Sequence, residues 1–269
     1  MESELRQLQL KCLEILDIII GICDKYQIKY SLCGGSVVGA HLYQLFLPWD
    51  DDIDRMMTCE NYNRFITIAE KVLPAGFSIN NYQNSDFSTT LGINYTKIIN
   101  DNTTFVHTNG KVKGIFIDIT VYDIVPKNIL KHIDLFLYKR AMTINRGKLP
   151  GYSPKNILRS FLLDTIFSNR RRYLKFAQRV IELIANRSSH CTYRELFGCY
   201  YFKNMVPYRT SIFEDYSSIE FEGRTVMIIR DYLEHLQTRF NRIGFHEPKK
   251  KQVPSHYAYV NFIYAIKNT

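Results

Sequence analysis

The sequence predicts an α+β protein whose first half combines helices with strands and whose second half is mainly helical. Three observations support this prediction. Apolar residues recur at three- and four-residue steps in residues 5–26 and 60–73, as in helices that face a core. In residues 114–125, Ile115, Ile117 and Ile119 alternate with other residues, which indicates a strand. After Pro126, longer stretches with helical spacing replace the strand patterns.

The elements expected at the N-terminus are a helix, a strand and a second helix. Residues 5–26 form the first helix, and residues 28–33 form a short strand that ends at Gly34-Gly35-Ser36. Residues 37–45 predict a helix with Ser36 as its N-cap, because serine is a preferred N-cap residue. Pro48 ends this helix, since proline has no backbone N–H.

The remaining elements follow the same rules. Residues 49–57 predict a strand that carries several aspartates, and residues 60–73 predict a helix that ends before Pro74 and Gly76. Two more strands are expected near residues 91–99 and 114–125. The helical patterns that follow cover residues 129–142, 155–167 and 171–185. We therefore predict a core of helices and strands at residues 1–126 and a mainly helical region at 127–269 that packs on it as one unit.

Composition limits the location and the partners of the protein. The 269 residues carry a formal net charge of +9, which favours an anionic partner. The six cysteines show no C-x-x-C pair, as expected in a reducing compartment. The polar N-terminus does not resemble a secretory signal, and no apolar run reaches the ~20 residues of a membrane span. We expect a cytoplasmic protein that contacts the inner face of the membrane at most peripherally.

The most informative segment is Pro48-Trp49-Asp50-Asp51-Asp52-Ile53-Asp54, with four carboxylates in five positions. On a strand, Asp50, Asp52 and Asp54 would project from one face and Asp51 from the other. Their mutual repulsion calls for a cation, and hard oxygen ligands suit Mg²⁺ or Mn²⁺.

Two other interpretations of this segment are weaker. An EF-hand needs glycine at the sixth position and glutamate at the twelfth, where this chain has Arg55 and Asn61. A solvated acidic loop is disfavoured by apolar neighbours such as Trp49 and Ile53.

Three further features predict phosphate and metal binding. Gly34 and Gly35 permit close backbone approach, and the N–H groups after Ser36 are suited to hold a phosphate. Asp118 lies in a run so apolar that its charge needs a partner, for which a metal is the natural candidate. Lys97 is placed to neutralise a donor phosphate, and a lysine extending from a strand edge to solvent is the equal alternative.

These segments resemble the LicD family, which includes bacterial phosphorylcholine transferases and is related to fukutin and the fukutin-related protein. The resemblance rests on residues 34–40, 46–54 and 114–119, with a weaker match at Phe221-Glu222-Gly223. It implies a nucleotidyltransferase fold with a mixed sheet, distantly similar to DNA polymerase beta. It also implies transfer of phosphorylcholine or a related phospho-group from a CDP-linked donor, such as CDP-choline, to a cell-surface glycan, lipid-linked glycan or teichoic acid precursor.

The resemblance also assigns roles to particular residues. Asp50, Asp52, Asp54 and Asp118 would be ligands of Mg²⁺ or Mn²⁺, and Asp52, Asp54 and Asp118 would be catalytic. Gly34, Gly35 and Ser36 would face the donor diphosphate. Where family members have arginine, glycine and a small or apolar residue, this chain has Leu42, Leu45 and Arg55. These departures leave open a catalytically weak binding or accessory protein in glycan assembly.

Several other segments are expected to have ordinary structural roles. The apolar residues 157–167, with the basic residues 170–172 after them, predict a core helix, with a membrane-surface helix as the alternative. His256 is expected at the surface, and His190, Cys191 and Cys199 do not complete a zinc site. No groove-reading motif accompanies the basic residues, so nucleic acid is not an expected partner.

Overall fold

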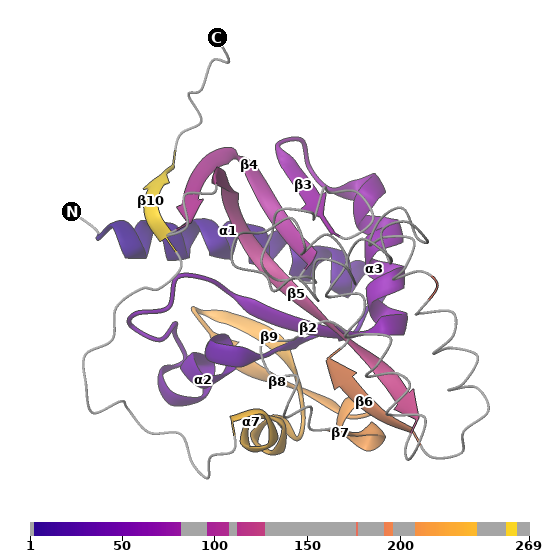
Figure 1. Ribbon diagram of the computed structural model, residues 1–269. Helices are drawn as coiled ribbons and strands as arrows, with labels where there is room; N and C mark the ends of the chain where they lie inside the picture. The colour runs from indigo at the N-terminus through magenta and orange to yellow at the C-terminus, as the bar shows by residue number, and fades with distance from the viewer. Residues whose placement is uncertain are drawn as a thin grey trace, which may run out of the picture. The chain divides into compact units, whose positions relative to one another are not determined.

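The computed structural model describes residues 3–81, 96–107, 112–126, 176, 191–195, 208–240 and 257–262 (Figure 1). The chain forms two compact units. The first contains Met1–Asn81, Tyr95–Tyr122 and Ser211–Thr269, and the second contains Tyr82–Asn94 and Asp123–Thr210. The acidic residues at 50–54, Lys97 and Asp118 all belong to the first unit. The division predicted at residue 126 stays a prediction.

Two predicted helices are confirmed. Helix α1 (Glu4–Tyr26) begins at an N-cap, Ser3, whose side chain accepts a hydrogen bond from Arg6 N, and it buries an apolar stripe that includes Leu8 and Ile19. Helix α3 (Cys59–Val72) begins at the N-cap Thr58 and contacts α1. The 3.6-residue periodicity therefore identified the faces that these helices bury.

Helix α2 (Gly34–Tyr43) begins three residues earlier than predicted, so the prediction of Ser36 as its N-cap is wrong. Its N-cap is Cys33, which makes no side-chain capping bond. Gly34 has a φ of 56°, a left-handed conformation that glycine adopts without steric cost. Strand β1 (Ser31–Leu32) can therefore turn directly into α2 at Gly34.

A mixed sheet forms the centre of the first unit. Its strands are ordered β1-β2-β5-β4-β10, with β3 also pairing with β4. Strands β2 and β5 are parallel, whereas the other pairs along this order are antiparallel. The bounds are Asp54–Thr58 for β2, Phe77–Asn80 for β3, Thr96–His107 for β4, Val112–Pro126 for β5 and Tyr257–Asn261 for β10. The predicted α+β class, the mixed sheet and the strand at 114–125 are thereby confirmed, and the strand expected near 91–99 is described from Thr96 onward.

The predicted strand at residues 49–57 is wrong in its first half, because β2 begins only at Asp54. Residues 48–53 form a turn and a loop, and Asp50 N donates a hydrogen bond to Leu47 O at 3.0 Å. The neighbouring strand β1 has only two residues, which pair with Arg55 and Met56. Asp50, Asp51 and Asp52 therefore have no strand geometry, and face alternation does not apply to them.

The two faces of the sheet differ in character. Thr96 of β4 pairs with Ile119 of β5, and the Tyr62 hydroxyl of α3 hydrogen-bonds to Thr96 at 2.6 Å, so α3 covers the face that carries Ile119. Side chains alternate along a strand, so Asp118 projects from the opposite face. Within the described part of the chain, that opposite face carries Asp54 and Asp118, the two singled-out aspartates that lie on strands.

C-terminal residues return to the first unit. Strands β8 (Tyr216–Phe221) and β9 (Arg224–Ile229) form a hairpin, which follows the short helix η3 (Thr210–Phe213) and precedes α7 (Tyr232–Phe240). Strand β9 lies beside β1, and Ile229 N donates to Ser31 Oγ at 3.0 Å.

The described residues do not confirm a mainly helical second half. In the second unit, β6 (Cys191–Glu195) pairs with β7 (Tyr208–Arg209). The helices predicted at 129–142, 155–167 and 171–185 lie outside the described residues, except for Phe176, which is helical. Among the helices that the structure describes, none combines the length and the apolar character needed to cross a membrane.

Candidate active site

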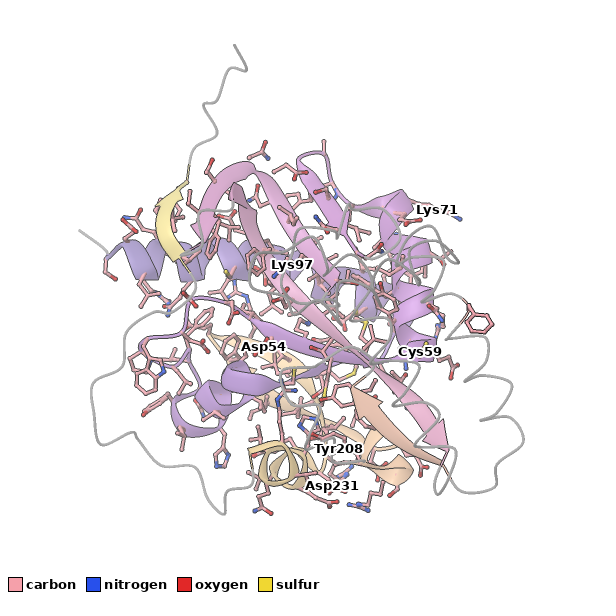
Figure 2. The ribbon with its side chains drawn as sticks, viewed as in Figure 1. Asp54, Cys59, Lys71, Lys97, Tyr208 and Asp231 are labelled. Atoms are coloured by element: carbon pink, nitrogen blue, oxygen red, sulfur yellow. The ribbon has the colours of Figure 1, made fainter. Side chains whose placement is uncertain are left out.

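Three charged residues form a row across three neighbouring strands. Asp54 of β2 lies opposite Asp118 of β5 in the parallel register, and Lys97 of β4 lies opposite Asp118 in the antiparallel register. Paired residues of adjacent strands project from the same face. The sheet therefore brings together residues more than 60 positions apart in the sequence, and Figure 2 labels Asp54 and Lys97 within it.

The carboxylates form two overlapping groups within the described residues. Asp52, Asp54 and Asp118 each offer an oxygen within 4.8 Å of the others, and the same holds for Asp50, Asp51 and Asp52. Asp52 belongs to both groups. Carboxylate oxygens are the ligands that Mg²⁺ and Mn²⁺ prefer, so the chemistry of this donor set fits such an ion. The structure thus brings together all four predicted metal ligands, with Asp50 in a different group from Asp54 and Asp118.

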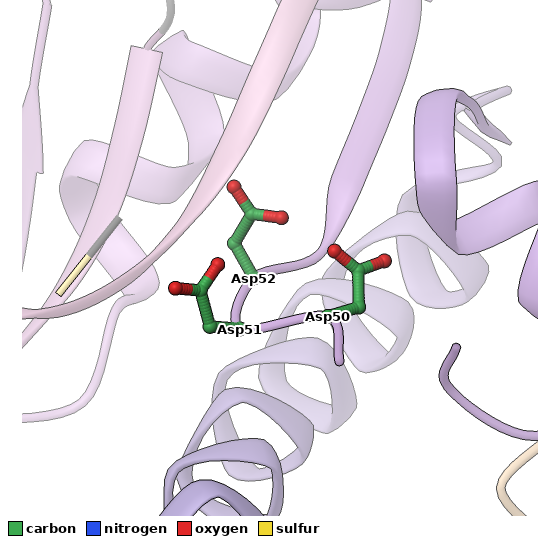
Figure 3. A group of neighbouring side chains, drawn as sticks. All are labelled: Asp50, Asp51 and Asp52. Carbon is green, nitrogen blue, oxygen red and sulfur yellow. The ribbon is translucent and has the colours of Figure 1, made fainter. Parts of the chain in front are cut away.

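Asp51 does not occupy the position that strand alternation implied. Figure 3 shows Asp50, Asp51 and Asp52 leaving consecutive loop residues toward the same side. Asp51 is 2% exposed, and its carboxylate lies in the same group as those of Asp50 and Asp52. The prediction that Asp51 projects away from Asp50 and Asp52 is therefore wrong, because residues 50–53 form a loop and not a strand.

The glycine turn fits closely around the aspartates. A Cβ atom at Gly34 would collide with the Asp54 carboxylate, and one at Gly35 would lie 2.6 Å from Asp50 Oδ2. Ser36 is fully buried, and its hydroxyl accepts a hydrogen bond from Asp54 N at 2.9 Å. The start of α2, where the helix dipole is positive, thus lies beside two carboxylates. Binding of a donor phosphate by Gly34, Gly35 and Ser36 stays a prediction.

Lys97 is the counter-ion of Asp118. Its Nζ lies 2.6 Å from Asp118 Oδ1 and 3.3 Å from the centre of the Phe116 ring. Both side chains are mostly buried, with exposed fractions of 15% for Lys97 and 11% for Asp118. An ion pair with little solvent contact is screened weakly, so Lys97 offsets part of the negative charge of the site. Its predicted contact with a donor phosphate is untested.

The charge of the cluster also affects α1. Burial raises the pKa of the Cys12 thiol well above its ordinary value, and Asp52, Asp51, Asp50 and Asp118 raise it further. Cys12 therefore stays a neutral thiol.

Arg55, one of the departures from the family pattern, lies outside the acidic site. It follows Asp54 on β2, so its side chain projects from the opposite face of the sheet. The side chain is fully buried, and its Cζ lies 3.9 Å from the centre of the Tyr30 ring. A charged side chain over an aromatic face is a cation–π contact, which gives Arg55 a structural role.

A second polar group, which sequence reasoning missed, lies on the face that carries Asp118. Tyr122 is four residues beyond Asp118 on β5, and its hydroxyl lies 2.9 Å from His235 Nε2 of α7. Arg239 Nη1 donates to the same hydroxyl at 3.3 Å, which directs the hydroxyl proton toward His235. Burial, followed by the charge of Arg239, lowers the pKa of His235 to about 3. His235 is therefore a neutral hydrogen-bond acceptor.

Because His235 is buried in its neutral form, we expect the stability of the fold to fall at acidic pH. The unfolded chain takes up a proton at His235 below pH ~6.5, whereas the folded chain does so only near pH 3. Stability from this group is complete above pH ~6.5 and falls by about 1.4 kcal/mol per pH unit below it. We expect urea unfolding to show that, between pH 7 and pH 5, the free energy of unfolding falls by about 2 kcal/mol more in wild type than in His235→Gln. Equal pH dependence in both proteins would contradict the assignment.

The fold and site define an α+β protein with an acidic centre on one face of a mixed sheet. Residues 27–150 match the LicD/FKTN/FKRP nucleotidyltransferase domain. Over 279 aligned residues the chain is 27% identical to the lipopolysaccharide cholinephosphotransferase LicD of Haemophilus influenzae, covering 94% of this chain and 96% of that protein. Residues 27–150 therefore carry a LicD-family domain, as the sequence motifs predicted.

Proposed function

We propose that this protein transfers phosphocholine, or a related phospho-group, from a CDP-linked donor to a hydroxyl of a glycan or teichoic acid precursor, with Mg²⁺ or Mn²⁺ as cofactor. The observation that carries the proposal is the convergence of Asp52, Asp54 and Asp118 within 4.8 Å of one another. Similarity to a cholinephosphotransferase over nearly the whole chain supports the choice of phosphocholine.

The proposed roles follow from the positions of the side chains. Asp52, Asp54 and Asp118 would hold a divalent ion, which supplies neutralisation of the charge on the transferred group. Asp118 or a neighbouring aspartate would accept the proton of the acceptor hydroxyl. Lys97 already sits beside Asp118, and its ammonium group would attract the donor phosphate toward the acidic centre.

The alternative is an accessory protein that binds donor or acceptor without turnover. Its basis in the sequence is Leu42, Leu45 and Arg55, of which Arg55 projects from the face of the sheet away from the acidic centre. Leu42 and Leu45, the latter 50% exposed at the start of the aspartate-bearing loop, remain the departures that favour this alternative.

Release of CMP discriminates the two functions. Purified protein would be incubated with Mg²⁺ or Mn²⁺, a glycan acceptor and CDP-choline or another CDP-linked donor. We expect CMP release that depends on both acceptor and metal and is largest for one donor. Saturable donor binding without CMP release across the donor panel would favour the accessory function, and turnover that persists in EDTA would contradict the role of the metal.

A further inference from the structure

We propose that Glu222 is a positioning residue that fixes the loop carrying the aspartates. This loop, residues 44–53, is called the aspartate loop below. The importance of this positioning for catalysis rests on the proposed function, whereas the contacts of Glu222 with the loop do not depend on that function. Glu222 lies outside residues 27–150, which match the family domain, and it is contributed by the turn between β8 and β9.

The Glu222 carboxylate joins the aspartate loop to α1. Its Oε1 accepts hydrogen bonds from Phe46 N at 3.1 Å and from Arg6 Nη1 at 3.0 Å, and its Oε2 accepts one from Arg6 Nη2 at 2.8 Å. The Glu222 side chain is only 4% exposed. Bidentate, charge-assisted hydrogen bonds with so little solvent contact fix both distance and orientation.

The backbone around Glu222 adds two contacts to the same loop. Glu222 N donates to Gln44 O at 2.8 Å, and the Phe221 ring packs on the Phe46 ring with centroids 5.0 Å apart. Glu222 has a φ of 54°, which is uncommon for a residue with a Cβ atom. Gly223 also has a positive φ, 71°, so both residues have the conformation that a two-residue hairpin turn requires, and the β8–β9 turn explains the φ of Glu222.

A second series of hydrogen bonds connects Arg6 with Asp50, the first aspartate of the loop. Arg6 Nη1 also donates to Gln9 Oε1 at 3.2 Å, and Gln9 Nε2 donates to Asp50 O at 2.9 Å. The loop is held on its other side by α2, since a Cβ atom at Gly39 would lie 2.7 Å from Leu47 N. The loop joins the sheet through Ile53 O, which accepts a hydrogen bond from Asp118 N at 3.2 Å, and the contacts described above hold the part of the loop that precedes Ile53.

The chain contains a built-in reporter of this loop. Its one tryptophan, Trp49, directly precedes Asp50 and is half-buried. Acrylamide quenching of Trp49 fluorescence measures how well the loop is held, without metal or substrate. Titration with Mn²⁺, followed by the rise in melting temperature, measures the consequence for the acidic centre.

Glu222→Gln is expected to increase Trp49 quenching and to lower the apparent Mn²⁺ affinity about 10- to 100-fold, the usual effect of losing a residue that orients a ligand. Arg6→Met should act in the same direction, and the double variant should add little, because both changes break the same ion pair. If Glu222→Gln does not fold, Arg6→Met tests the same contact. The Arg6 side chain is 37% exposed on α1, so we expect this substitution to leave the fold intact.

Two controls separate positioning from general destabilisation. Glu220→Gln removes an exposed carboxylate of the same hairpin, and Val226→Ala removes buried apolar contacts from β9. Val226→Ala should lower the melting temperature, yet both controls should keep wild-type quenching and Mn²⁺ affinity. Wild-type quenching in folded Glu222→Gln and Arg6→Met would overturn the proposal. Absence of a Mn²⁺ response in wild type would instead count against the proposed function, and the quenching comparison would still decide the role of Glu222.

Discussion

Asp118→Asn and Asp54→Asn are each expected to lower kcat/KM at least about 10³-fold, which corresponds to about 4 kcal/mol of transition-state stabilisation. Each change removes one carboxylate from the group formed with Asp52, and asparagine keeps the shape of the aspartate side chain. Both variants should also lose the rise in melting temperature that Mn²⁺ gives wild type, because that rise requires binding to the folded state.

Without metal, the two variants should differ in melting temperature. Asp118→Asn leaves Lys97 mostly buried without its carboxylate partner, so its melting temperature should fall. Asp54→Asn removes one of several repelling carboxylates, so its melting temperature should stay the same or rise slightly. Asp101→Asn is the matched control, since that carboxylate is exposed on β4, where it accepts a hydrogen bond from the Ser78 hydroxyl of β3.

Comparison with Asp51→Asn tells which group of carboxylates holds the ion. Asp51 belongs to the group with Asp50 and Asp52, whereas Asp118 belongs to the other. Loss of the Mn²⁺ response in Asp118→Asn but not in Asp51→Asn is the expected result. The reverse pattern would place the ion in the loop, and a full response in both Asp118→Asn and Asp54→Asn would refute the proposed centre.

The sequence was sufficient where local chemistry decides the structure. The periodicities of residues 5–26 and 60–73 identified α1 and α3, because burial of one helical face follows directly from spacing. The density of aspartates identified the acidic centre, since so many like charges among apolar residues need a functional explanation. Asp118 was found for the same reason, as a single charge in an apolar strand.

Long-range pairing limited the remaining predictions. Whether Asp50 lies on a strand depends on the length of the neighbouring strand, and β1 is only two residues long. Spacing also gave no sign that β4 would place Lys97 against Asp118. Glu222 was part of a weak motif, but its bonds to Arg6 and Phe46 span 216 and 176 positions. Such contacts form only when the whole unit folds.

Gly34→Ala is expected to disrupt the site more than any other change of one methyl group. Alanine at a φ of 56° costs about 1–3 kcal/mol of stability, because its Cβ atom disfavours the left-handed conformation. The new methyl group would also displace the Asp54 carboxylate, so the Mn²⁺-dependent rise in melting temperature and the transferase activity should both be lost.

Gly35→Ala separates the steric effect from the backbone effect. Gly35 lies in the first turn of α2 with an ordinary negative φ, yet a Cβ atom there would lie 2.6 Å from Asp50 Oδ2. Gly21→Ala in α1 is the control, since its Cβ atom meets nothing within 4 Å and should raise stability by up to about 1 kcal/mol. We expect Gly35→Ala to keep most of its stability and to lose Mn²⁺ affinity. If Gly34→Ala and Gly35→Ala both bound Mn²⁺ as wild type does, the glycines would not be needed to make room for the carboxylates.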